Sequence, residues 1–204
     1  MVVNDPANPA TRVALAGLYQ RKKLYGPAIT QYQEALKLDD QHRGALIGMG
    51  MAYYEAGKTK EAQAAFERIV EMSQDNGPRE QTALVAGVHF FLGKIYAANG
   101  DLPRAEIELK LALSVNRGDA DTIHELAQVQ AQLGRNEDAI QLYEVAVSMV
   151  PDYAEAYAGL AKAYAAAGRT AEADYAAAMV DLWRGNYDMA ITRLNAVVRA
   201  KPEL

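Results

Sequence analysis

The sequence predicts an all-α fold, a right-handed superhelical solenoid of about eleven antiparallel helices. Alanine and leucine are abundant among the 204 residues, whereas β-branched residues are sparse, which favours helix throughout. Stacked helix–turn–helix units repeat about every 34 residues. One alanine recurs in matching surroundings at spacings of 34, 43, 34 and 34 residues, at Ala28, Ala62, Ala105, Ala139 and Ala173. The 43-residue spacing is one repeat with nine inserted residues.

Aligning the sequence on these alanines predicts the order of the elements. We expect five repeats, at residues 9–42, 43–76, 86–119, 120–153 and 154–187. Three further segments are a possible upstream repeat's tail at 1–8, an insertion at 77–85, and a final helix, offset by half a repeat, at 188–204. Proline is favoured in the first turn of a helix, so Gly77–Pro78 predicts that the insertion lengthens the next helix to about Pro78–Ala98. The alternative is a longer loop.

Each feature of a repeat has a physical cause. A large–small pair such as Leu92–Gly93 lets one helix approach its neighbour closely. A glycine such as Gly100 supplies the positive φ that ends the first helix. The recurring alanine, for example Ala105, is expected where two helices touch, and an aromatic residue four positions later lies on the same face. A proline such as Pro151 stops the second helix.

Taken together, these features resemble the tetratricopeptide repeat, and the resemblance covers residues 9–187 with one insertion. The departures are Lys23 in place of glycine, Gln130 in place of tyrosine, and the absence of the stop proline in the first three repeats. The resemblance implies that the first helices of the repeats line a concave surface that binds a segment of a partner protein.

The same resemblance implies which side chains face this groove. The expected binding residues are Met51, Tyr54, Phe90, Phe91, Lys94, His124, Gln128 and Lys162. The first half of the groove is expected to be apolar with glycine gaps, among them Gly17 and Gly48, and the second half to be polar. Exposed apolar patches mark binding sites. The alternative is that some of these side chains pack on neighbouring helices, with at least one of Phe90 and Phe91 buried.

Composition argues against several classes of function. The net charge is −5 and no lysine- or arginine-rich block occurs, so we expect no nucleic-acid partner. No run of about 18 apolar residues occurs, so we expect no direct membrane insertion. The chain has no cysteine, which excludes disulfides and thiolate metal sites but leaves the compartment open between cytoplasm and periplasm.

Catalytic and metal-binding patterns are also missing. The three histidines, His42, His89 and His124, lie in separate repeats, and none has a second histidine three or four residues away. No glycine-rich phosphate loop and no Gly-x-Ser-x-Gly sequence is present. We therefore expect no metal, no cofactor and no enzymatic activity.

The sequence predicts a protein–protein interaction module that binds a partner segment in its groove. Pro6 falls where the stop proline of an upstream repeat would lie, so we expect a fragment of a larger repeat protein. The alternative to a fragment is a whole protein with an irregular start. Two other functions stay open. One is homo-oligomeric assembly through exposed solenoid ends, and the other is an accessory region that positions a catalytic or membrane domain outside this chain.

Overall fold

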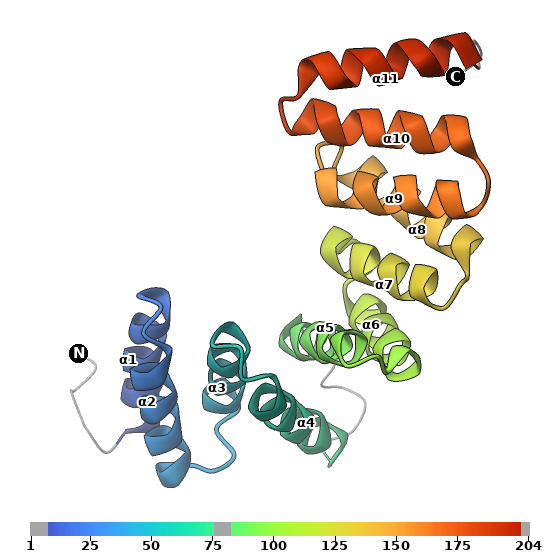
Figure 1. The fold of residues 1–204 in the computed structure, drawn as a ribbon. Coiled ribbons are helices and arrows are strands. Elements are labelled where there is room, and N and C mark those ends of the chain that lie inside the picture. Colours follow the sequence, from blue (N-terminus) through green and yellow to red (C-terminus); the bar gives the residue numbers. More distant parts are fainter. Residues whose placement is uncertain (1–7, 76–82, 201–204) are drawn as a thin grey trace. The chain divides into compact units, whose positions relative to one another are not determined.

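The computed structural model describes residues 8–75 and 83–200, and within them it is entirely helical. This confirms the predicted all-α fold (Figure 1). The helices of the described residues are α1 (Pro9–Arg21), α2 (Tyr25–Leu38), α3 (Arg43–Glu55), α4 (Thr59–Asp75), α5 (Ala83–Ala98), α6 (Leu102–Val115), α7 (Ala120–Gln132), α8 (Asn136–Met149), α9 (Ala154–Ala166), α10 (Thr170–Trp183) and α11 (Tyr187–Ala200).

The chain divides into two compact units, Met1–Ile95 and Tyr96–Leu204. In the first unit α1 packs on α2, α2 on α3, and α3 on α4, and α1 also contacts α3. In the second unit each helix from α6 to α11 packs on the next, and α7 also contacts α9. Contacts between every second helix, α1 with α3 and α7 with α9, create a continuous face of first helices inside each unit.

The turn inside each helix pair has the predicted left-handed residue. Five glycines have φ between 74° and 80°: Gly57, Gly100, Gly134, Gly168 and Gly185. Lys23 stands where the first repeat lacks glycine, and it adopts the same conformation with a φ of 58°. The amide of Leu24 donates to the Tyr19 carbonyl at 2.9 Å, as the amide of Lys58 donates to the Tyr53 carbonyl at 2.8 Å. The turn geometry is therefore kept at Lys23, at the cost of a strained backbone for a residue with a Cβ.

Helix starts are set by local side chains. Asn8, Asp101 and Asp119 each accept a hydrogen bond from a backbone amide in the first turn of the helix that follows. The His42 Nδ1 does the same for α3, accepting from the Ala45 amide at 3.2 Å. These caps satisfy donors that have no partner within the helix.

The recurring alanines are buried at helix contacts. Four of the five are fully buried and Ala173 is 8% exposed. The longer first helix of the third repeat is α5, which has 16 residues where α1, α3, α7 and α9 have 13. Its expected start at Pro78 lies outside the described residues.

Cations cover the tyrosines at the end of the first helices. The Arg104 guanidinium lies 4.4 Å from the centre of the Tyr96 ring, and Arg169 lies 4.5 Å from that of Tyr164. Such stacking of a cation on a ring is favourable.

Gln130 replaces the expected tyrosine and binds an arginine by a hydrogen bond, where the tyrosines bind one by stacking. The Arg135 guanidinium donates to the Gln130 Oε1 at 3.1 Å and to the Glu106 carboxylate at 3.0 Å. The Gln130 amide also donates to Glu106, at 3.0 Å. A polar network thus replaces the ring at this position, which explains why the departure is accommodated.

Candidate functional site

The first pocket forms where the second helix of one repeat meets the first helix of the next. The Tyr32 ring of α2 lies under Gly48 of α3, and a Cβ at position 48 would come within 2.5 Å of the ring. The Tyr32 hydroxyl donates to the Gln20 Oε1 at 3.1 Å, and the Gln20 amide donates to the Glu55 carboxylate at 3.0 Å. Burial, reinforced by the Glu55 charge, raises the pKa of Tyr32. The ring is thereby held rigidly as the floor.

Above this floor lies a hollow of about 390 Å³ on the first-helix face. Its lining is mostly apolar surface from α1, α2 and α3. The lining residues are Gly17, Gln20, Arg21, Tyr32, Gly44, Ile47, Gly48, Met51 and Glu55. A Cβ at Gly17 would meet nothing within 4 Å, so this glycine leaves real space, whereas the expected gap at Gly48 is filled from below by Tyr32.

A second pocket in the other unit is built in the same way. The Tyr143 ring of α8 lies under Gly159 of α9, where a Cβ would again come within 2.5 Å of it. Burial raises the pKa of Tyr143 to about 12, and the Glu125 charge adds to the effect. His124 packs beside this floor, with its ring centre 5.6 Å from that of Tyr143.

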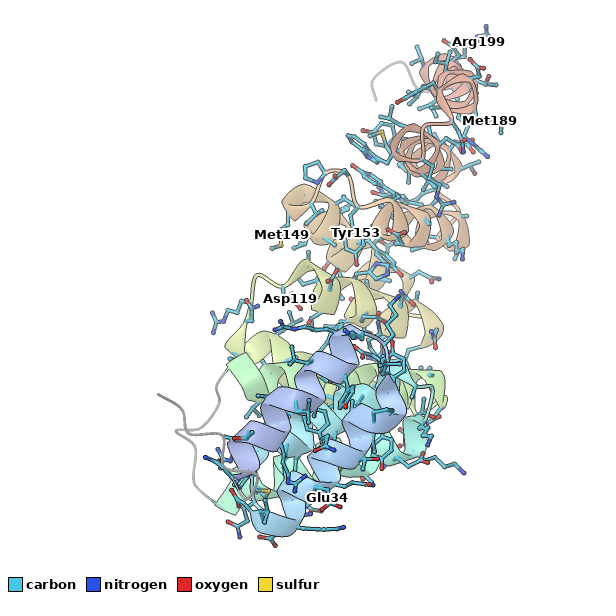
Figure 2. The ribbon with its side chains drawn as sticks, turned by 90° about the vertical axis from the view of Figure 1, so that its left-hand side faces the viewer. Glu34, Asp119, Met149, Tyr153, Met189 and Arg199 are labelled. Carbon is cyan, nitrogen blue, oxygen red and sulfur yellow. The ribbon has the colours of Figure 1, made fainter. Side chains whose placement is uncertain are left out.

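His124 also contacts Tyr153, which comes from the turn between α8 and α9 and is labelled in Figure 2. The two ring centres are 5.1 Å apart, and the Tyr153 hydroxyl donates to the Asp121 carboxylate at 2.8 Å. Burial, followed by this hydrogen bond, raises the pKa of Tyr153. His124 also contacts the Gln128 side-chain amide. With an exposure of only 7%, this histidine forms a wall of the pocket.

The second pocket has a volume of about 370 Å³ and a more polar lining than the first. Its lining residues are His124, Gln128, Ala131, Gln132, Tyr143, Glu155, Ala158, Gly159, Lys162 and Arg184. Charged side chains from α9 and from the end of α10 thus border a cavity whose floor is an aromatic ring.

In the third repeat, an aromatic cluster occupies the position that corresponds to Gly48 and Gly159 at the two pockets. Phe91 is sixth in its expected repeat, as Gly48 and Gly159 are in theirs, and it stacks on the buried Phe66 with ring centres 5.6 Å apart. Tyr54 and Phe90 meet Phe91 edge-on at 5.1 and 5.4 Å. The Lys94 ammonium lies 5.3 Å from the centre of the Phe90 ring. Phe90 and Phe91 are both half-buried, so the expectation that one of them would be buried is wrong.

The structure distributes the eight expected binding residues over three places. Met51 lines the first pocket, and His124, Gln128 and Lys162 line the second. Tyr54, Phe90, Phe91 and Lys94 belong to the aromatic cluster. That these residues bind a partner stays a prediction.

Sequence reasoning missed the two floor tyrosines, because they lie on the second helices α2 and α8, whereas first helices were expected to line the groove. A signal was present, since Tyr32 and Gly48 are 16 residues apart, as are Tyr143 and Gly159. Arg184 was missed for a similar reason, because it follows α10, a second helix.

Two kinds of feature are absent from the part of the chain that the structure describes. In that part of the chain, no group of three or more His, Cys, Asp or Glu side chains could hold a metal ion. None of the described helices combines the length and the apolar character needed to cross a membrane.

Comparison with known proteins identifies the repeat. The tetratricopeptide repeat profile matches residues 13–78 and 47–121, which together exceed half of the chain, and a TPR repeat profile matches residues 127–168. Cellulose synthase operon protein C from Xanthomonas axonopodis pv. citri (strain 306) is 30% identical over 153 residues. That match covers 74% of this chain, but the chain spans only 10% of the length of this relative.

Solved structures share the fold. A crystal structure of MamA protein has a TM-score of 0.73 at 22% identity and covers 96% of both chains. The crystal structure of YrrB, described as a TPR protein with an unusual peptide-binding site, has a TM-score of 0.73 at 18% identity and covers 94% of both chains.

Repeat solenoids present extended concave surfaces for binding, which indicates that this chain is in general terms a scaffold for protein–protein interaction. The repeat pattern, the helix pairs with their left-handed turns and the profile matches lead to one conclusion: this chain belongs to the tetratricopeptide repeat family.

Proposed function

We propose that this chain binds extended segments of a partner protein on the face that the first helices form within each unit, without catalysing a reaction. The observation that carries the proposal is the repeated construction of the two pockets. In each, a tyrosine from one repeat lies under a glycine of the next and leaves a hollow on the first-helix face. A hollow above a ring can receive one side chain of an extended segment.

Rigidity of the pockets supports this proposal. Tyr32 is 4% exposed and its hydroxyl is hydrogen-bonded, and Tyr143 is 2% exposed. A preformed site leaves most of the ordering cost to the partner segment, which favours binding. YrrB, which shares this fold, is described as having an unusual peptide-binding site.

Selection of peptides tests the proposal. A random peptide library displayed on phage is selected on the immobilised chain, and the binding of recovered peptides is measured by fluorescence anisotropy. Met51→Glu places a charge in the apolar first pocket and should weaken recovered peptides on the order of tenfold. Met149→Glu is the matched control, because Met149 is 42% exposed and lines neither pocket.

Helicity measured by circular dichroism should be unchanged in both variants. Peptides that bind Met51→Glu as tightly as the native chain, and that also tolerate glutamate at Lys162, would contradict groove binding.

Homo-oligomeric assembly is a second candidate, favoured by α11. This helix exposes a set of large apolar side chains, Tyr187, Met189, Ile191 and Val198, by 53–64%; Met189 and Arg199 of this helix are labelled in Figure 2. Exposed apolar patches of this kind mark interaction sites. Light scattering across a concentration series tests it, and a mass that stays monomeric throughout contradicts it.

A place within a longer protein is a further proposal. Its support is the Xanthomonas relative, of whose length the chain spans 10%. In such a protein this segment would position a domain outside it, and crosslinking within the full-length protein would test that role.

A further inference from the structure

The two pockets differ in what their floor hydroxyl does. In the first pocket, the Tyr32 hydroxyl is already engaged because it donates to Gln20. In the second, the Tyr143 hydroxyl makes no hydrogen bond to any described residue, although Tyr143 is only 2% exposed. This hydroxyl is not fully enclosed, and Tyr143 lines the pocket, so a group that enters the pocket can form a hydrogen bond with it.

The Tyr143 hydroxyl is a donor near neutral pH. Burial and the Glu125 charge raise its pKa to about 12, so the phenol keeps its proton. The hydroxyl can therefore donate a hydrogen bond to an acceptor in the pocket.

Two cations border the same pocket without a partner. Lys162 lies on α9 and Arg184 directly follows α10, and neither makes an ion pair or a hydrogen bond with the described residues. Some cations elsewhere are paired, since Arg135 contacts Glu106 at 3.0 Å and Arg193 contacts Asp181 at 2.9 Å. The second pocket therefore combines one unused hydroxyl donor with two unused cationic donors.

Carboxylates are present as well. Glu155 lines the pocket, and the Glu125 charge acts on the Tyr143 hydroxyl. The charges thus nearly balance, and an anion would be held by direct donor contacts rather than by a net positive field. Hydrogen bonds between charged donors and a carboxylate are short and strong.

We infer that the second pocket binds the carboxylate of an aspartate or glutamate side chain in the partner segment, held by Tyr143, Lys162 and Arg184. The first pocket differs because its hydroxyl is satisfied and its lining includes Ile47 and Met51, and it takes an apolar side chain. The partner is thus a protein segment that carries an acidic residue. This inference rests on the proposed function, since it names the chemistry of a segment bound on the first-helix face.

The test uses the same phage-displayed peptide library and compares variants of the full chain. Peptides recovered on the native chain should be enriched in Asp and Glu. The double variant Lys162→Glu, Arg184→Glu should lose that enrichment and weaken acidic peptides at least tenfold. Tyr143→Phe keeps the ring under Gly159 and should weaken the same peptides severalfold.

Matched controls separate the pocket from the general charge of the protein. Arg117→Glu reverses one charge, half the change of the double variant, at an exposed residue outside both pockets, and it should leave the acidic peptides bound. Tyr175→Phe removes a hydroxyl from a 42% exposed tyrosine of α10 and should likewise have no effect. Replacing the acidic residue of a recovered peptide by its amide should weaken binding to the native chain, but not to the double variant.

The outcomes distinguish this inference from the proposed function. Peptides that depend on Met51 but show no acidic enrichment would overturn the inference and leave groove binding intact. Acidic peptides weakened equally by Arg117→Glu would also overturn it, because a general charge effect would then be responsible. Peptides that depend on neither pocket would overturn both.

Discussion

Replacing Lys23 by glycine should stabilise the protein. Lys23 holds a φ of 58° in a turn where five equivalent positions are glycine with φ between 74° and 80°. A residue with a Cβ in this left-handed region costs about 1–2 kcal/mol. Glycine removes that strain but adds about 0.5–1 kcal/mol of backbone entropy in the unfolded chain. The expected net gain in the free energy of unfolding is therefore about 0.5–1 kcal/mol.

Loss of a positive charge must be separated from the backbone effect, because cations favour the end of a helix. Lys22→Gly is the control, since Lys22 is the adjacent exposed lysine and has a φ of −82°. It removes the same charge but relieves no strain, so it should destabilise by about 0.5–1 kcal/mol.

Thermal unfolding followed by circular dichroism measures both variants. A gain of this size raises the midpoint by about 1–4 °C in a chain of this length. The reasoning fails if Lys23→Gly unfolds at or below the temperature of Lys22→Gly, because the left-handed turn would then carry no measurable strain.

Two further predictions concern packing and acid stability. A Cβ at Gly50 would come within 2.6 Å of the Phe66 ring, so Gly50→Ala should destabilise by about 1–3 kcal/mol in urea unfolding. Gly87→Ala has open space within 4 Å and should be neutral or stabilising; equal losses in both would contradict the packing argument. The Lys110 hydrogen bond, helped by weaker hydrogen bonds from Gln130 and Arg135, lowers the pKa of Glu106 from 4.5 to about 2. The ionised Glu106 therefore stabilises the fold above its unfolded-state pKa, and this contribution is lost as pH falls from about 4.5 to 2. Glu106→Gln should flatten that part of the curve of stability against pH. An unchanged slope would argue against these hydrogen bonds to Glu106.

Much of the local structure could be predicted from the sequence. The alanine interval, the glycine turns and the helix order all depend on contacts within one repeat, which spacing and residue type encode directly. Even Lys23, a departure from the pattern, adopts the expected turn, because the neighbouring backbone hydrogen bonds impose it.

The site was predicted only in part, because its pockets depend on contacts between repeats. Gly48 was expected to leave a gap, yet the Tyr32 ring fills that space from below. His124 was expected to face the groove and lines the second pocket, but its role as a pocket wall depends on Tyr143 and Tyr153, which lie 19 and 29 residues further along the chain.

The sequence by itself determined the repeat, its turns and the face on which binding is expected. Only the tertiary structure decided which donors remain unused. Tyr32 and Tyr143 stand at equivalent positions, but one hydroxyl finds Gln20 and the other finds no partner among the described residues. Whether a side chain is satisfied depends on the three-dimensional position of a group from another helix, and no periodicity in the sequence carries that information.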